Sequence, residues 1–329
     1  MNRKAGVIGI GGYVPDKILS NFDMEKIVDT SNEWIVTRTG IRERRVSTED
    51  QATSDLAAVA AQRAIESAGI SAKEVELIIV ATLTPDSNMP STACIVQDKI
   101  GAVNAAAFDL GAACTGFIYA MVVGKQFVES GVYKNVLVIG AEAMSKVLDW
   151  EDRSTCVLFG DGAGAALLGV VDEEEGILSF ELGSDGSGHD CLKIPAGGSR
   201  IPASIESVNS RLHYLTMAGP EVFKFAVRAM PGSSKRVIEK AGIGIEDVDV
   251  IVPHQANMRI LEASAKRLKC PMEKIFVNLD KYGNMSGGSI PYALYEAYTQ
   301  NKIKKGDTVL MVGFGAGLTW GALLLKWSI

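Results

Sequence analysis

The sequence contains few cysteines and histidines, and this scarcity argues against disulfides and metal sites. Five of the 329 residues are cysteine and three are histidine. The cysteines are widely spaced, form no CxxC pair and are not adjacent to a histidine, whereas zinc-binding motifs bring such ligands together at short spacings. An odd number of scattered thiols in a long chain is typical of reduced cysteines in the cytosol. We therefore expect no disulfide, no metal ion and a cytoplasmic protein.

Long apolar runs and an excess of basic residues are also missing. No apolar run approaches the roughly 18 residues of a membrane-spanning helix. Residues 1–17 have a basic start and an apolar stretch, as a signal peptide does. Four glycines interrupt that stretch and no small-residue cleavage site follows, so we expect a β-strand instead. The 33 basic and 39 acidic residues give a net charge of −6, which matches a nucleic-acid binder poorly, and we expect no membrane or nucleic acid as a partner.

The composition is globular, and strand and helix patterns alternate along the chain. The chain is 47% hydrophobic and 22% charged, and its length suggests two domains or one large α/β unit. Short runs rich in valine and isoleucine alternate with helical patterns, which predicts an α/β fold with mostly parallel sheets. The predicted strands are Gly6–Gly11, Val75–Thr82, Ala105–Leu110, Val136–Gly140, Gly164–Val171, Val248–Val252, Lys274–Val277, Thr308–Gly313 and Trp320–Lys326. The predicted helices are Ser54–Ser67, Gly116–Ser130, Glu221–Ala241 and Met258–Leu268.

Parts of the sequence repeat at a constant offset. Three pairs of segments are similar at an offset of 173 residues: 65–80 and 238–253 (238 − 65 = 173), 136–140 and 309–313, and 119–121 and 292–294. Three matches at one spacing predict a duplicated βα unit with pseudo-twofold symmetry. We place the boundary between the halves, 1–173 and 174–329, in the acidic segment Asp172–Gly176. Taken alone, this segment also fits an ordinary solvated loop.

Cys114 is the strongest candidate for a nucleophile. It follows a predicted strand and a run of small residues, and a helix begins directly after it. This arrangement resembles a nucleophile elbow without the GxSxG sequence. Because a helix N-terminus stabilises a thiolate, we predict a pKa about one to two units below that of a free thiol. The offset pairs Cys114 with Gly287, so a pseudo-twofold axis would bring both helix starts to the centre. The other four cysteines fit buried structural residues: Cys94, Cys156, Cys191 and Cys270.

Two further residues are candidates for catalysis. His254 directly follows a predicted buried strand, at the strand end where α/β proteins keep their functional sites. Asn284 precedes a helix start rich in glycine and serine, where its amide can donate an N–H to a developing oxyanion. On residue type alone, a lone histidine also fits a structural role, and an asparagine among glycines also fits a turn.

Together, Cys114, His254 and Asn284 resemble the Cys-His-Asn set of the β-ketoacyl-[acyl carrier protein] synthase III family, in the thiolase superfamily. The resemblance spans nearly the whole chain, and its matching segments are Val28–Arg44, Asp109–Phe117, Phe159–Ala165, Pro253–Asn257 and Gly317–Gly321. It implies a thiolase-like α/β fold of two duplicated βα halves, layered α-β-α-β-α. The N-terminal half would carry the nucleophilic cysteine, and the C-terminal half the histidine and the asparagine.

The resemblance also implies a reaction, the initiating step of type II fatty acid synthesis. An acyl-CoA would acylate Cys114, malonyl-[acyl carrier protein] would lose CO₂, and the resulting carbanion would attack the thioester to give 3-oxoacyl-[acyl carrier protein]. The N–H groups of His254 and Asn284 would stabilise the malonyl thioester oxygen. The backbone N–H groups of Cys114 and Ala316 would stabilise the oxyanion of the acyl-enzyme. CoA is then part of a substrate, and no cofactor is expected.

The binding residues follow from the same resemblance. Those expected to bind CoA are Thr30, Trp34, Arg38, Arg153, Gly219, Phe223 and Asn257. Those expected to bind the acidic acyl carrier protein are Gln255, Ala256, Asn257, Met258, Arg259, Lys266 and Arg267. Lys266 by itself also fits an ordinary solvated helix face. In a homodimer, the segment around Met89 would reach the partner's site and Met89 would close the acyl pocket, where a flexible methionine admits a longer or branched starter.

The chain departs from the family pattern in two segments. Asn284–Ser289 has two glycines where alanines are usual, and Gly315–Gly317 has a central alanine in place of glycine. Glycine and alanine both keep the backbone N–H donor, so we expect these departures to leave catalysis intact. They can change the width of the pocket and the flexibility of the loops.

Other functions fit parts of the sequence. A dinucleotide-dependent oxidoreductase would use a glycine-rich loop, but neither Gly6–Gly12 nor Gly160–Gly164 completes GxGxxG between a strand and a helix. A thioesterase would use the same cysteine without malonate. A non-catalytic scaffold would have lost one of the three site residues, and all three are present. A synthase of specialised metabolism would share the mechanism with other substrates, and the sequence leaves that alternative open.

Overall fold

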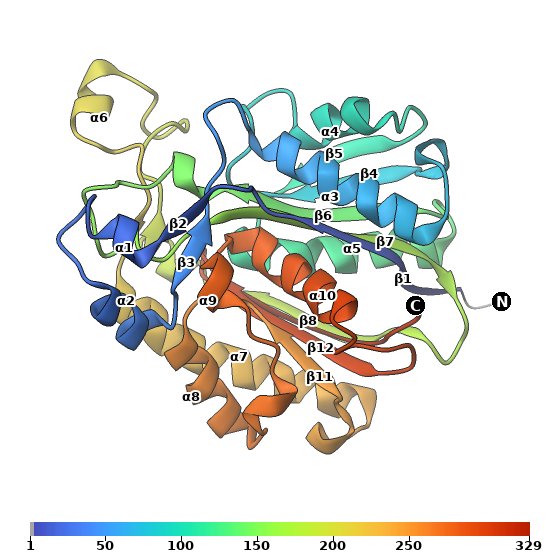
Figure 1. The fold of residues 1–329 in the computed structure, drawn as a ribbon. Coiled ribbons are helices and arrows are strands. Elements are labelled where there is room, and N and C mark those ends of the chain that lie inside the picture. The colour runs from blue at the N-terminus through green and yellow to red at the C-terminus, as the bar shows by residue number, and fades with distance from the viewer. Residues whose placement is uncertain (1–2) are drawn as a thin grey trace.

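The computed structural model describes residues 3–329, in which two β-sheets are covered by helices (Figure 1). The first sheet has the strand order β1-β7-β6-β4-β5 and the second has the order β11-β12-β13-β8. The strands of the first sheet are β1 (Lys4–Tyr13), β4 (Leu77–Ala81), β5 (Ala106–Leu110), β6 (Val136–Ala143) and β7 (Asp161–Val171). Those of the second are β8 (Gly176–Ser184), β11 (Val250–Pro253), β12 (Thr308–Gly315) and β13 (Thr319–Lys326). Two short strand pairs lie outside these sheets: β2 (Ile18–Ser20) with β3 (Glu43–Arg45), and β9 (Leu192–Lys193) with β10 (Thr216–Met217).

The helices differ widely in length. They are α1 (Asn21–Met24), α2 (Asn32–Thr39), α3 (Thr53–Ala68), α4 (Thr92–Ile100), α5 (Gly116–Ser130), α6 (Ile205–Asn209), α7 (Gly219–Ala241), α8 (Met258–Leu268), α9 (Leu279–Tyr282) and α10 (Ser289–Thr299). Within residues 3–329, no helix combines the length and the hydrophobicity that crossing a membrane requires.

The helices and sheets stack in five layers, as the resemblance implied. Helices α3 and α4 cover the outer face of the first sheet, α5 and α10 lie between the sheets, and α7 and α8 cover the outer face of the second. Side chains alternate across a strand: in β6, Val136 and Val138 pack in the central layer, whereas Leu137 and Ile139 pack under α3. Each strand of the sheet interior is therefore buried on both faces, which explains its continuous apolar sequence.

The second sheet repeats the first. Its order β8-β13-β12-β11 corresponds to β1-β7-β6-β4. The matching outer helices, α3 and α7, both end at a glycine with a left-handed backbone, Gly69 at φ 68° and Gly242 at φ 72° (242 − 69 = 173), a conformation that glycine adopts without strain. The acidic segment forms the turn from β7 into β8. These features support a division into 1–173 and 174–329, which stays a prediction.

Three details of the predicted fold were wrong. The sheets are mixed rather than mostly parallel, because β7 and β13 run antiparallel to both of their neighbours. Lys274–Val277 is not a strand: a 3₁₀ turn covers Met272–Lys274, and one bridge from Ile275 to Ile251 stands where the first half has β5. Strand β8 was not predicted, and neither were the short strands β2, β3, β9 and β10.

Candidate active site

The starts of two central helices meet beside Cys114. The 3₁₀ turn η2 (Ala113–Thr115) leads into α5, and η7 (Ser286–Gly288) leads into α10. Ala113 and Ser286 are 173 residues apart (286 − 113 = 173), and both have a positive φ, 48° and 45°, so the chain bends sharply at equivalent points of the two halves. The Cys114 Sγ and the Ser286 Oγ lie 3.3 Å apart. The predicted meeting of the two helix starts is therefore confirmed.

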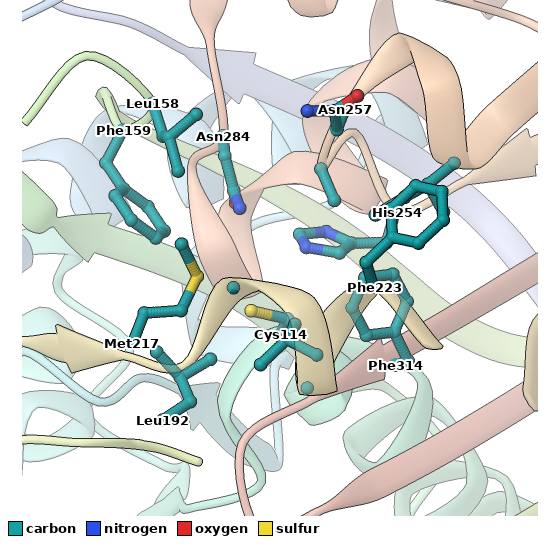
Figure 2. Close-up of a pocket in the computed structure, with 15 residues that line it drawn as sticks. Cys114, Leu158, Phe159, Leu192, Met217, Phe223, His254, Asn257, Asn284 and Phe314 are labelled. Atoms are coloured by element: carbon teal, nitrogen blue, oxygen red, sulfur yellow. The ribbon is translucent and has the colours of Figure 1, made fainter. Parts of the chain in front are cut away.

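Cys114, His254 and Asn284 line one cavity of about 160 Å³ (Figure 2). They come from η2, from the residue after β11, and from the loop between α9 and η7. All three are buried, with exposed fractions of 5%, 1% and 7%. The cavity wall also contains three of the expected CoA contacts and several apolar side chains: Gly219, Phe223, Asn257, Leu158, Phe159, Val222 and Phe314.

A second cavity, of about 170 Å³, also reaches Cys114. The two cavities share Cys114, Phe159 and Leu192. The second cavity has a mostly apolar wall that includes Leu83, Met144, Ile194, Leu215, Ser286 and Ala316. The sulfur thus borders a chamber with His254 and Asn284 and a chamber suited to an apolar chain. This arrangement allows an acyl group to stay on the cysteine while another reactant approaches from the first cavity.

The end of β12 packs directly against Cys114. A Cβ on Gly315 would lie 2.8 Å from the backbone nitrogen of Cys114, closer than side-chain carbons approach other atoms, so this position requires glycine. Ala316 follows immediately and lines the second cavity. The backbones of Cys114 and Ala316 therefore lie close together, and their service as oxyanion donors stays a prediction.

The predicted low pKa of Cys114 was wrong. Burial raises the pKa of the thiol to about 12, an effect that the hydrogen bond with Ser286 offsets only in part and that the charge of Glu142 increases. Removing a thiolate from water opposes ionisation more strongly than a helix start favours it. The resting group at neutral pH is therefore a neutral thiol, which must lose its proton as it attacks.

His254 is a neutral ring held at the end of β11, the strand end that the sequence predicted. Its backbone N–H donates to the Val312 carbonyl at 2.8 Å, and its ring packs edge-on against Phe314 with centroids 5.5 Å apart. Burial lowers the pKa of His254 to about 3. The imidazole consequently keeps one N–H donor and one acceptor nitrogen at physiological pH. Among residues 3–329, none hydrogen bonds to its Nδ1.

Asn284 is held with its amide nitrogen toward the cavity. Its Oδ1 accepts a hydrogen bond from the Ser286 backbone N–H at 2.8 Å, and its own backbone N–H donates to the Leu158 carbonyl at 2.9 Å. Because the side-chain oxygen is occupied, the NH₂ group is the part that points into the cavity (Figure 2). The geometry offers a donor beside His254 and Cys114.

Two residues of the site were not identified from the sequence: Ser286, described above, and Glu142. Glu142 lies in β6 and is fully buried. Its carboxylate accepts hydrogen bonds from the end of β4 and from η7: the hydroxyls of Thr82 and Thr84 and the backbone N–H groups of Leu83, Thr84 and Gly287. Burial raises the pKa of Glu142 to about 7, although these hydrogen bonds lower it. The sequence signal for this residue was a single acid within an otherwise apolar strand.

The residues expected at the CoA nucleotide gather around Trp34. The guanidinium carbons of Arg38 and Arg153 lie 4.4 and 5.1 Å from its ring centroid, a stabilising cation–π arrangement. The Asn257 Nδ2 donates to the Arg38 carbonyl at 3.0 Å, which connects this cluster to the first cavity. The buried Oγ1 of Thr30 has no hydrogen-bond partner within the described chain.

The residues expected at the carrier-protein surface do not all lie on the surface. Gln255 is fully buried, because its side chain bonds to the Pro253 and Phe276 carbonyls, and Ala256 lines the first cavity. Gln255 therefore offers no exposed side-chain surface, and the assignment of both residues to carrier-protein contact stays a prediction. The remaining members lie on or next to α8: Asn257 and Met258 are half-buried, Arg259 and Lys266 are exposed, and Arg267 is exposed but donates to the Val227 carbonyl at 2.8 Å.

Met89 does not contribute to the cavities of its own chain. Its side chain is 85% exposed, and it lines neither cavity beside Cys114. An acyl-pocket role for Met89 therefore requires a second copy of the chain.

The five cysteines are free thiols. Cys94 is exposed and Cys191 is half-buried, so the expectation of buried structural cysteines was correct only for Cys156 and Cys270. In the described part of the chain, no group of three or more His, Cys, Asp or Glu side chains is arranged to hold a metal ion.

Comparisons with known proteins agree on one family. The family model described as 3-oxoacyl-[acyl-carrier-protein] synthase III matches residues 108–186, and the model of its C-terminal region matches residues 238–327. A β-ketoacyl-[acyl-carrier-protein] synthase III of Clostridioides difficile is 62% identical over 329 residues, which is 100% of each chain. The crystal structure of 3-oxoacyl-[acyl-carrier-protein] synthase III from Aquifex aeolicus superposes with a TM-score of 0.91 at 49% identity, covering 98% of this chain and 100% of that one. The Thermus thermophilus enzyme gives a TM-score of 0.92 at 49% identity, covering 98% and 99%.

The fold, the cavity and these similarities agree with the resemblance that the sequence motifs indicated. The chain belongs to the β-ketoacyl-[acyl-carrier-protein] synthase III family, whose members are acyltransferase-type condensing enzymes with the thiolase fold.

Proposed function

We propose that the chain condenses an acyl-CoA starter with malonyl-[acyl carrier protein] and releases CoA and CO₂. The product is 3-oxoacyl-[acyl carrier protein], the first condensation product of fatty acid synthesis. The observation that carries this proposal is the position of the Cys114 sulfur between two cavities, one of which contains the N–H donors of His254 and Asn284. The proposal includes a cytoplasmic enzyme that needs no cofactor.

In the first half-reaction, the sulfur of Cys114 attacks the thioester carbonyl of the acyl-CoA. The bond from sulfur to the acyl carbon forms, and the bond to the CoA sulfur breaks. Because burial keeps Cys114 as a thiol, its proton must leave during the attack, and the departing CoA sulfur takes up a proton to leave as a thiol. The apolar second cavity receives the acyl chain.

In the second half-reaction, malonyl thioester occupies the first cavity. The bond to its carboxylate breaks, CO₂ leaves, and negative charge develops on the thioester oxygen. The N–H groups of His254 and Asn284 stabilise that charge, and one such donor contributes about 3–4 kcal/mol. The carbanion then attacks the acyl-enzyme, and the backbone N–H groups of Cys114 and Ala316 hold the oxyanion. Cys114 leaves as a thiolate and takes a proton from solvent.

The surroundings of the cavity support binding of the two substrates. In the structure the Arg153 guanidinium lies over the Trp34 ring. An adenine inserted between them would contact the aromatic ring on one face and the cation on the other. Gly219, Phe223 and Asn257 line the path from there to Cys114. Exposed cations of α8, Arg259 and Lys266, would attract an acidic carrier protein.

Mapping the acylated residue tests this function. After incubation with acetyl-CoA or isobutyryl-CoA, peptide mass spectrometry is expected to find the acyl group on Cys114 alone, and added malonyl-[acyl carrier protein] should remove it with release of CO₂. Acylation of Cys94, the exposed thiol, with Cys114 unmodified would refute the proposal. Loss of the acyl group without malonate would indicate a thioesterase.

The proposal extends to a homodimer in which Met89 of each chain enters the other chain's acyl pocket. The 85% exposure of Met89 in a single chain is compatible with it, because the side chain is free to contact a second chain. Sedimentation at micromolar concentration is expected to give twice the 35.0 kDa of one chain. A fully active monomer would contradict the dimer.

Met89→Phe is expected to change the choice of starter. Methionine is unbranched and adapts to a longer or branched chain, so the wild-type kcat/KM for isobutyryl- or butyryl-CoA should equal or exceed that for acetyl-CoA. A rigid ring should move the ratio toward acetyl-CoA by about tenfold or more. Exposed Ile205, 83% accessible, provides the matched control as Ile205→Phe. An unchanged ratio in Met89→Phe would exclude Met89 from the pocket.

A further inference from the structure

Ser286 makes a polar contact with the nucleophile that the mechanism above does not use. Its Oγ lies 3.3 Å from the Cys114 Sγ, and within residues 3–329 it is the only side chain that hydrogen bonds to this sulfur. Ser286 is 1% exposed, so its hydroxyl is screened from bulk water. We propose that Ser286 is a further catalytic residue, whose hydroxyl donates a hydrogen bond to the Cys114 sulfur and stabilises the negative charge that develops there. This inference rests on the proposed function of Cys114.

The chemistry of the sulfur fixes the direction of the hydrogen bond during reaction. In the resting thiol, either atom can donate. A thiolate, or the sulfur of a thioester, carries no hydrogen and can only accept. The hydroxyl of Ser286 must therefore be the donor once Cys114 begins to attack, and a hydrogen bond to a charged acceptor is roughly twice as strong as one between neutral groups.

The backbone around Ser286 holds the hydroxyl in place. Hydrogen bonds anchor three successive amides of this turn: Met285 N–H to Ser289 Oγ at 2.8 Å, Ser286 N–H to Asn284 Oδ1 at 2.8 Å, and Gly287 N–H to Glu142 at 3.4 Å. Ser286 itself has a φ of 45°, a conformation that glycine adopts freely and that strains other residues. Glycine would fit this backbone with less strain, and the feature that serine adds is a hydroxyl that contacts the Cys114 sulfur.

The charged and titratable groups near the sulfur provide little other stabilisation. His254 is neutral because burial lowers its pKa to about 3. Lys193 lines the second cavity, but its amine pairs with Asp190 at 2.6 Å. Glu142, behind Gly287, raises the pKa of Cys114. Apart from backbone dipoles at the helix start, the hydroxyl of Ser286 is the group that favours negative charge on sulfur.

The reaction contains two steps in which this contact acts and one in which it does not. In acylation, the sulfur loses its proton as it bonds to the acyl carbon, and CoA takes up a proton and leaves as a thiol. In condensation, the bond from sulfur to carbon breaks and the sulfur takes a proton from solvent. Ser286 keeps its own proton throughout. Decarboxylation of the malonyl group involves no change at the sulfur, so Ser286 should not affect it.

Ser286→Ala tests the proposal by separating these steps. The variant is expected to slow alkylation of Cys114 by iodoacetamide at a fixed pH, and its acylation by acyl-CoA, each by about tenfold or more. Decarboxylation of malonyl-[acyl carrier protein] should stay within about twofold of wild type, because the backbone N–H that holds Asn284 remains. A purely structural role would lower all three rates together.

Two further variants separate the hydroxyl from the backbone. Ser286→Gly removes the hydroxyl and relieves the strained φ, and it should lose as much acylation as Ser286→Ala. Ser289→Ala removes another fully buried hydroxyl of the same turn, one that contacts Met285 rather than the sulfur, and it should keep the wild-type alkylation rate.

The opposite outcomes would overturn the assignment. These are an unchanged alkylation rate in Ser286→Ala, wild-type acylation in Ser286→Gly, or a loss in Ser289→Ala equal to that in Ser286→Ala. Failure of the proposed function is distinguishable from these outcomes. In that case wild-type Cys114 would accept no acyl group from acyl-CoA, although iodoacetamide would still report on the contact with Ser286.

Discussion

Cys114→Ala is expected to abolish acyl transfer and leave decarboxylation of malonyl-[acyl carrier protein] measurable. The substitution removes the sulfur that both cavities share, so no acyl-enzyme can form, and loss of a catalytic nucleophile lowers turnover by about 10⁶-fold. The donors that stabilise the malonyl thioester oxygen come from His254 and Asn284, which the substitution does not touch. Acyl transfer is measured with labelled acetyl-CoA, and decarboxylation by release of labelled CO₂.

Cys156→Ala is the matched control for this experiment. Cys156 is also a buried thiol, but it packs in the core cluster of the second sheet and lines neither cavity. It should retain full acyl transfer. If Cys114→Ala still formed a covalent acyl-enzyme, or if Cys156→Ala lost acyl transfer to the same extent, Cys114 would not be the nucleophile.

The strands that could be predicted are those that are buried on both faces of a sheet. Strand β6 is buried along its whole length, so its sequence is continuously apolar. Strand β8 at the edge of the second sheet is partly exposed along its second half, and its mixed sequence gives no comparable signal. The antiparallel direction of β7 and β13 depends on where the chain returns to the sheet, which local sequence patterns do not encode.

The site residues that could be predicted are those whose place next to a strand or a helix is visible in the local sequence. His254 follows a strand and Cys114 precedes a helix, and both patterns are local. The raised pKa of Cys114 arises from burial beneath segments far away in the sequence. A prediction based on the helix start alone therefore gave the wrong direction for the pKa shift. Ser286 looks like an ordinary turn residue, but its 173-residue distance from Ala113 would have placed it beside the cysteine. Gln255 was expected to contact the carrier protein because the resemblance implies it, although its side chain is buried.

His254→Ala and Asn284→Ala are each expected to lower decarboxylation by about 10²–10³-fold, the usual effect of removing one oxyanion donor. The test is cleanest in the Cys114→Ala background, where decarboxylation proceeds without acyl transfer. Both donors act on the same oxygen. In the variant that combines Cys114→Ala, His254→Ala and Asn284→Ala, the loss of decarboxylation rate should therefore be much smaller than the product of the two separate losses. Asn278→Ala is the control, since Asn278 is similarly buried but bonds to Glu296 outside the cavity, and it should decarboxylate normally.

The pH dependence of the same reaction distinguishes a neutral histidine from a charged one. Burial lowers the pKa of His254 to about 3, so above that pH the folded protein holds the ring neutral. The decarboxylation rate should therefore show no inflection near the ordinary histidine pKa of about 6.5 that disappears in His254→Ala, whereas an inflection caused by Glu142, whose pKa burial raises to about 7, would remain. The unfolded chain binds a proton at His254 near pH 6.5 and the folded chain does not, so His254 destabilises the fold progressively as the pH falls from about 6.5 toward 3. His254→Ala should therefore lose part of the acid sensitivity of the wild type in urea unfolding. A rate that rises with protonation near pH 6.5 and disappears in His254→Ala would show that the imidazolium, rather than the neutral ring, stabilises the thioester oxygen.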